Sequence, residues 1–214
     1  MFTGIIEEIG NIKEIKNTGI NNSLTISCTK LLEDIKLGDS IAVNGICLTV
    51  SKFDNKSFTA DVMPVTIQKS NLRNCRSGEF INLERALQLE SRIGGHLVSG
   101  HIDGTGKIIS ITKYENAIIF KIQIDPELRK YMIPEGSICI DGISLTIAEL
   151  ERNHLTVSII PETMQNTILK YKKIDDTVNI ESDMVGKYLY NFLQDQGKTK
   201  SNISMKFLAE NGFI

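Results

Sequence analysis

Two short segments carry the side chains best suited to chemistry. Residues 47–49 read Cys-Leu-Thr, and residues 144–146, found 97 positions later, read Ser-Leu-Thr. A cysteine thiol and a serine hydroxyl can both act as nucleophiles or relay protons. Cysteine in a strand is usually a small buried residue, but the serine counterpart and the neighbouring threonines favour a polar, partly open site around Cys47.

A histidine provides a third reactive group. His101 follows Gly100 in the glycine-rich stretch 94–104, and Ile5 is its counterpart 96 positions earlier. One copy therefore has an acid/base group where the other has an aliphatic one, although a histidine in a turn can also be an ordinary surface residue. His96 is five residues from His101, so on an extended chain the two face opposite sides, which argues against a shared metal ion.

These residues belong to an internal duplication. Gly4-Ile-Ile6 returns as Gly100-His-Ile102 at a spacing of 96, and Asn44-Gly45 returns as Asp141-Gly142 at a spacing of 97. Further matches follow in the same order, which is far beyond chance. The chain therefore divides into residues 1–96, residues 97–182 and a tail of residues 183–214.

Each copy reads as a run of short strands with turns every 8–12 residues, which predicts two small closed barrels and an all-β fold. Asn44-Gly45 predicts a hairpin because both residues tolerate positive φ. Beyond that turn, alternation places Cys47, Thr49 and Ser51 on one face. Residues 1–16 suggest a bent strand broken by Gly10, and Pro64 predicts the start of a short helix.

The tail has a different pattern. Val185, Tyr188, Leu189 and Phe192 recur at helical spacing, with Ser182 as the expected N-cap. A second short helix is expected over residues 202–211. An apolar stripe outside the barrels predicts self-association or packing across the two barrels, and the pattern leaves both open.

Composition narrows the function classes. The 214 residues carry a net charge of −2 with 41% hydrophobic residues, and there is no basic block that would indicate nucleic-acid binding. No apolar run approaches the length of a membrane span, and no targeting segment is evident, so a cytoplasmic protein is expected. The four cysteines have no metal-type spacing.

Several motifs in register resemble the riboflavin synthase family over the full length: MFTGIIEEIG, NGICLTV, GGHLVSGHIDG, DGISLTI, IIPET and VNIE. The resemblance implies two similar six-stranded Greek-key barrels and a C-terminal helix that forms a homotrimer. It implies transfer of a four-carbon unit between two molecules of 6,7-dimethyl-8-ribityllumazine, which gives riboflavin and 5-amino-6-ribitylamino-pyrimidinedione. No metal or organic cofactor is implied, a lumazine synthase is a possible partner, and no nucleic acid or membrane is expected.

The resemblance also implies two ligand sites, each completed by a neighbouring subunit. The first-copy site comprises Gly4, Ile5, Ile6, Cys47, Leu48, Thr49, Asp61, Val62, Met63, Pro64, Val65 and Thr66. The second-copy site comprises Gly100, His101, Ile102, Ser144, Leu145, Thr146, Ser158, Ile159, Ile160, Pro161, Glu162 and Thr163. Proton handling is assigned to His101 and Ser144, polar or nucleophilic help to Cys47 and Ser40, ring covering to Phe2, and a supporting acid to Asp183.

Two positions depart from the family pattern. Val65 stands where a glutamate is usual, and Glu135 stands where a ligand-contacting lysine is expected. A second class of function uses the same fold, since non-catalytic antenna relatives bind a lumazine or flavin. The presence of Cys47, His101 and Ser144 together with the tail helix favours the enzyme, and a plain flavin carrier would leave the second barrel unexplained.

Overall fold

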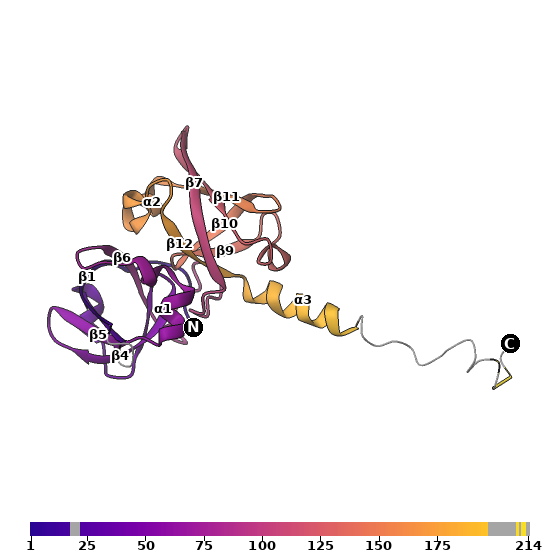
Figure 1. Cartoon of the computed structure of the whole chain (residues 1–214). Coiled ribbons are helices and arrows are strands. Elements are labelled where there is room, and N and C mark those ends of the chain that lie inside the picture. The colour runs from indigo at the N-terminus through magenta and orange to yellow at the C-terminus, as the bar shows by residue number, and fades with distance from the viewer. Residues whose placement is uncertain (18–21, 197–208, 210, 213–214) are drawn as a thin grey trace.

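Twelve strands form two closed antiparallel barrels in the computed structural model, which describes residues 1–17, 22–196, 209 and 211–212 (Figure 1). The first barrel contains β1 (Glu8–Asn17), β2 (Asn22–Ser27), β3 (Ser40–Val43), β4 (Ile46–Phe53), β5 (Ser57–Asp61) and β6 (Phe80–Arg85). The second contains β7 (Gly104–Tyr114), β8 (Ala117–Gln123), β9 (Ser137–Ile140), β10 (Ile143–Leu150), β11 (His154–Ile159) and β12 (Thr177–Ser182).

Both barrels follow the same strand order. Around the first barrel the order is β1-β2-β5-β4-β3-β6, and the second repeats it with β7 to β12 in the corresponding places. The predicted all-β fold of two similar six-stranded barrels is therefore confirmed. Short helices link the strands: η1 (Lys30–Asp34), α1 (Pro64–Lys69), η2 (Asn71–Asn74), η3 (Arg129–Tyr131), α2 (Pro161–Asn166) and η4 (Ile168–Tyr171).

The local predictions hold where turn chemistry decides them. Asn44 and Gly45 join β3 to β4 with φ values of 46° and 80°, as expected for a two-residue hairpin turn. Pro64 opens α1 as its first residue. The predicted break at Gly10 is wrong: β1 runs through it, and the register shifts between Ile12 and Glu14. Gly10 instead leaves room for the side chain of Leu83, which a Cβ would meet at 2.6 Å.

Each barrel has its own apolar core. Phe58 and Leu83 are fully buried in the first core, and Phe120 and Ile122 are buried in the second. Along β4, Ile46, Leu48 and Val50 point inward, while Cys47, Thr49 and Ser51 point outward as predicted. The polar rows that could bind a ligand are thus on the outer faces of the barrels.

Paired buried asparagines hold the barrels together. Asn82 of β6 donates from its side chain to the Asp141 carbonyl at 2.8 Å, and Asn179 of β12 donates to the Asn44 carbonyl at 2.8 Å. The two bonds are equivalent under the repeat, so they form a pseudo-twofold pair between the hairpin turns. Because an unsatisfied buried polar group costs about 1–3 kcal/mol, this pairing fixes the relative orientation of the barrels.

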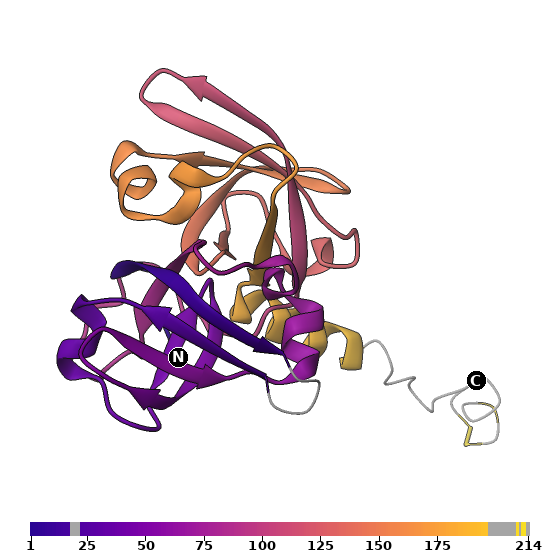
Figure 2. The same cartoon turned by 60° about the vertical axis from the view of Figure 1, so that its left-hand side comes forward.

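The tail helix α3 (Met184–Gln196) extends away from the second barrel (Figure 2). Lys187 binds Asp103 at 2.6 Å, and Tyr190 meets Tyr131 edge to face, so one side of α3 rests on that barrel. Asp183 caps the helix by accepting from the Val185 amide at 2.9 Å, whereas the predicted cap, Ser182, ends β12. The predicted second helix lies largely outside the described residues. No helix of the described chain is long and apolar enough to span a membrane.

Candidate functional site

Two equivalent segments cross from one barrel to the other. The N-terminal strap (residues 1–6) precedes β1, and the central strap (residues 97–102) precedes β7. The straps pair with each other through Phe2 and Val98. Beyond this bridge Ile6 packs against the core of the second barrel, and Ile102 packs against the core of the first.

The crossing brings the N-terminal strap onto β10, the strand that carries Ser144, and the central strap onto β4, the strand that carries Cys47. The Ser144 amide donates to the Gly4 carbonyl at 2.8 Å, and the Cys47 amide donates to the Gly100 carbonyl at 2.9 Å. Gly4 and Gly100 have positive φ, and a Cβ on either would lie 2.6 Å from the Cβ of Ser144 or Cys47. Only glycine allows this approach.

The predicted grouping of the straps is therefore wrong. Gly4, Ile5 and Ile6 were expected beside Cys47, and Gly100, His101 and Ile102 beside Ser144, because each strap was assigned to its own copy. The structure joins each strap to the other copy instead. The physical reason is the pseudo-twofold packing of the barrels, which places the start of each copy against the outer face of its partner.

The first barrel thus gathers one set of predicted residues. Thr49 and Ser40 are directly paired across β3 and β4, and Cys47 lies two residues before Thr49 on the same outer face. His101 is exposed on the central strap. It directly follows Gly100, whose carbonyl accepts from the Cys47 amide. The chain leaves β5 beside this face, because Val50 of β4 pairs with Ala60 of β5. It continues there through Asp61, Val62, Met63, Pro64, Val65 and Thr66, which end β5 and begin α1.

The second barrel gathers the equivalent set around Ser144. Ser137 pairs with Thr146 as Ser40 pairs with Thr49. Ser158, Ile159, Ile160, Pro161, Glu162 and Thr163 end β11 and begin α2. The Glu162 carboxylate accepts from Asn166 at 2.6 Å, whereas Val65, its counterpart, is 50% exposed and offers no acceptor.

His96 is a site residue that the sequence reasoning missed. Its Nδ1 lies 2.7 Å from the Ser144 hydroxyl oxygen, and its amide donates to the Thr3 carbonyl at 3.1 Å. Gly95 lies against Ser144 as well. The glycine-rich segment Gly94-Gly-His96 at the end of the first copy marks this place in the sequence, but no local pattern links it to residue 144.

Electrostatics suit His96 for accepting a proton. Burial lowers the pKa of its imidazole below the ordinary value of 6.5, and the charges of Asp183 and Glu181 oppose this shift without cancelling it. The imidazole is therefore neutral near pH 7 and can hydrogen-bond the serine hydroxyl as a base. Asp183 acts here as a helix cap and a nearby charge, and its role as a supporting acid stays a prediction.

The other cysteines lie in unreactive surroundings. Burial raises the pKa of the Cys28 and Cys75 thiols to about 12 and raises that of the Cys139 thiol well above its ordinary value. Cys47 is half-buried on the polar outer face. A thiol reacts as the thiolate, so these three residues are structural, and Cys47 differs from them by lying on the outer face of β4.

Two further predicted residues differ in their surroundings. Phe2 is completely buried with Ala42, Val98 and Cys139 between the barrels, so its ring supports the strap and has no exposed face to cover a ligand. Glu135 lies exposed with φ of 61° in the turn before β9, two residues from Ser137. Its counterpart in the first copy is Gly38, which has a similar backbone conformation.

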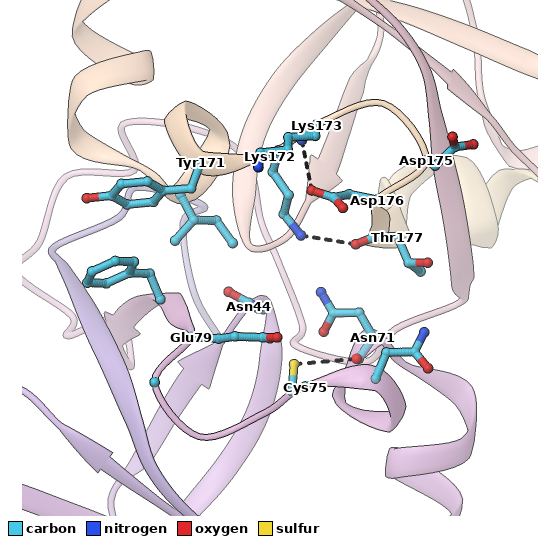
Figure 3. Close-up of a pocket in the computed structure, with 14 residues that line it drawn as sticks. Asn44, Asn71, Cys75, Glu79, Tyr171, Lys172, Lys173, Asp175, Asp176 and Thr177 are labelled. Carbon is cyan, nitrogen blue, oxygen red and sulfur yellow. Dashed lines mark hydrogen bonds between the residues drawn. The ribbon is translucent and has the colours of Figure 1, made fainter.

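A cavity of about 560 Å³ lies elsewhere on the interface between the barrels (Figure 3). Lys172 reaches into it, donates to the Thr177 carbonyl and pairs with buried Asp141 at 2.9 Å. Phe80 and Tyr171 stack across the interface at 4.5 Å between ring centroids. None of the predicted site residues is among those described as lining this cavity, and its contacts serve the junction of the barrels.

Comparison with known proteins agrees with this geometry. The Lumazine binding domain family model matches residues 3–86 and 99–183. The chain is 50% identical to a riboflavin synthase of Bacillus subtilis (strain 168) and 49% identical to one of Actinobacillus pleuropneumoniae, over 100% of each chain in both cases. The crystal structure of LumP complexed with riboflavin superimposes with a TM-score of 0.79 and 27% identity, covering 85% of this chain and 99% of that one.

Proposed function

The chain belongs to the riboflavin synthase family, and from this premise we propose that it converts two molecules of 6,7-dimethyl-8-ribityllumazine into riboflavin and 5-amino-6-ribitylamino-pyrimidinedione. The observation that carries the proposal is the pair of sites that are alike in shape and unlike in reactive groups. On the first barrel the Cys47 amide binds the carbonyl of Gly100, the residue before His101, and on the second barrel His96 lies at hydrogen-bond distance from Ser144. Two identical substrates that must play different parts need such a pair.

The reaction requires proton removal from the acidic methyl on ring carbon 7 of one lumazine and addition of a nucleophile to the other ring. Neutral His96, at 2.7 Å from the Ser144 hydroxyl, supports proton transfer on the second barrel. His101 provides an exposed acid/base group beside Cys47 on the first. Thr49 and Thr146 supply hydroxyls for ring carbonyls and nitrogens. Holding the two rings stacked provides much of the rate by orientation.

The two reacting rings must come into contact. We propose that this happens in a homotrimer, in which the first barrel of one subunit faces the second barrel of the next. The tail helix supports this assembly. Val185, Tyr188, Leu189 and Phe192 are 58%, 62%, 58% and 67% exposed, although the opposite side of α3 rests on its own barrel. An apolar helical stripe left open in this way is suited to burial against other copies.

A direct assay tests the function. The full-length protein is incubated with the lumazine alone, and riboflavin is followed by its fluorescence and by chromatography. The proposal requires one riboflavin and one pyrimidinedione for every two lumazines consumed, with no added cofactor. Tight lumazine binding without either product would instead identify an optical antenna or carrier, and the proposal would be wrong.

A further inference from the structure

Each strap is held by a buried carboxylate of the barrel whose first strand it precedes. Glu84 of β6, 4% exposed, accepts from the Thr3 amide at 2.6 Å, the Thr3 hydroxyl at 2.6 Å and the Gly4 amide at 3.0 Å. These three bonds fix the N-terminal strap to the first barrel. The strap then continues to Ser144 on the second barrel.

The same arrangement recurs at the repeat-related position. Glu181 of β12, 2% exposed, accepts from the Ser99 amide and hydroxyl at 2.7 Å each and from the Gly100 amide at 3.0 Å. The central strap is thereby fixed to the second barrel and continues to Cys47 on the first. Two charged side chains placed alike inside strands, with matching bonds, indicate a function that the duplication preserved in both halves.

The bonds continue from each carboxylate to the reactive groups. Thr3, held by Glu84, accepts the His96 amide on its carbonyl, and Gly4 accepts the Ser144 amide. Glu84 thus sets both members of the His96–Ser144 pair, although it belongs to the other barrel. On the central strap, the Ser99 hydroxyl that binds Glu181 also accepts the His101 amide at 3.2 Å.

We propose that Glu84 and Glu181 are crossed positioning residues, each of which holds the strap that completes the ligand site of the opposite barrel. The inference deepens the proposed function and rests on it for the catalytic consequence. A carboxylate satisfies three donors at once, whereas an amide of the same shape presents N–H groups that cannot accept. Because the strap glycines contact the reactive strands directly, loss of one anchor shifts groups across the interface.

The first test measures the straps without substrate. Amide hydrogen exchange is followed by NMR for Cys47 and Ser144 in the full-length protein and in the variants Glu84→Gln and Glu181→Gln. We expect Glu84→Gln to accelerate exchange at least tenfold at Ser144 and little at Cys47, and Glu181→Gln to do the reverse. Glu149→Gln, on the same strand as Ser144 but away from the straps, is the matched control and should change neither.

The second test measures catalysis. Single-turnover riboflavin formation should fall about tenfold to a hundredfold in each variant, as expected for displaced reacting groups. The dissociation constant of a non-reactive lumazine analogue should change less than threefold. If a glutamine variant does not fold, Thr3→Val and Ser99→Ala remove one anchoring bond each and should give the same crossed pattern more weakly.

The outcomes separate the two proposals. The crossed arrangement would be overturned if Glu84→Gln accelerated amide exchange mainly at Cys47 and Glu181→Gln mainly at Ser144. Equal acceleration at both amides would overturn it as well. A crossed exchange pattern with full turnover would overturn the positioning role. Failure of the unmodified protein to form riboflavin would count against the proposed function and, with it, the catalytic part of this inference, while the exchange result would still decide how the straps are held.

Discussion

The imidazole Nδ1 of His96 lies 2.7 Å from the hydroxyl oxygen of Ser144. The two residues come from different structural units, since His96 lies in the segment between β6 and β7 and Ser144 is the second residue of β10. The N-terminal strap binds both residues, since the Thr3 carbonyl accepts from the His96 amide and the Gly4 carbonyl accepts from the Ser144 amide. A nucleophile and a base at hydrogen-bond distance are what proton transfer requires.

Replacement of His96 should test this pair. Glutamine can still hydrogen-bond Ser144 but cannot accept a proton near neutral pH, so single-turnover riboflavin formation by His96→Gln should fall about 10²–10⁴-fold. Binding of a non-reactive lumazine analogue should change little. His154→Gln, far from the straps on β11, is the matched control. Retention of near-full turnover by His96→Gln would assign the histidine a structural part only.

The pH dependence follows from the direction of the His96 shift. Because burial lowers the pKa of His96, the imidazole stays neutral at pH values where an ordinary histidine has begun to charge. The midpoint of the acidic decline in turnover should therefore lie below the ordinary histidine value of 6.5. A pH–rate profile of the wild type beside His96→Gln checks this, since the variant should lack that acidic limb. A limb that persists in the variant belongs to another group.

His101 should matter on the opposite barrel. His101→Gln should lower turnover about 10²–10⁴-fold with little change in lumazine binding, if it moves the methyl proton. Ser144→Ala should cost less if the serine only relays or orients. Introducing Ile5→His should not rescue His101→Gln, because Ile5 lies on the strap beside the second barrel. Loss of turnover that only tracks weaker binding would contradict a proton-handling role.

The exposed face of α3 should hold the oligomer together. Leu189→Glu combined with Phe192→Glu places charges on that face and should convert the proposed trimer to monomers with little activity, because each complete site of that trimer needs two chains. Light scattering measures the mass. Asn191→Glu, exposed on the same helix but off the apolar stripe, should leave both mass and activity unchanged. A double variant that keeps the parental mass would remove this part for α3.

Val65 should weaken the first ligand site. A charge-assisted hydrogen bond is worth about 1.5–3 kcal/mol when buried and less when water competes. Val65 is 50% exposed, so Val65→Glu should tighten binding at one of the two sites by about tenfold at most. Calorimetric titration with the lumazine resolves the two affinities. Glu162→Val should weaken the other site, and two unaffected affinities would mean that other groups hold the ribityl chain.

The features that could be predicted from the sequence are those that depend on residues close together in the chain. The duplication, the hairpin at Asn44-Gly45, the outward row of Cys47 and Thr49 and the helix start at Pro64 all depend on residues within a few positions of one another. Backbone conformation at a glycine and the alternation of side chains along a strand are properties of short segments. The prediction of barrels follows from these local signals, because a run of short antiparallel strands removes its exposed sheet edges by closing into a barrel.

Only the tertiary structure decided how the two copies share their sites. The sequence assigned Gly4 to the first copy and Gly100 to the second, yet each lies on the reactive strand of the other barrel. His96 owes its place beside Ser144 to the same crossing. These contacts join residues about fifty to one hundred and forty positions apart, and they depend on the pseudo-twofold packing of two complete barrels. No periodicity or turn motif encodes that packing, because it arises from surfaces that exist only after each barrel has closed.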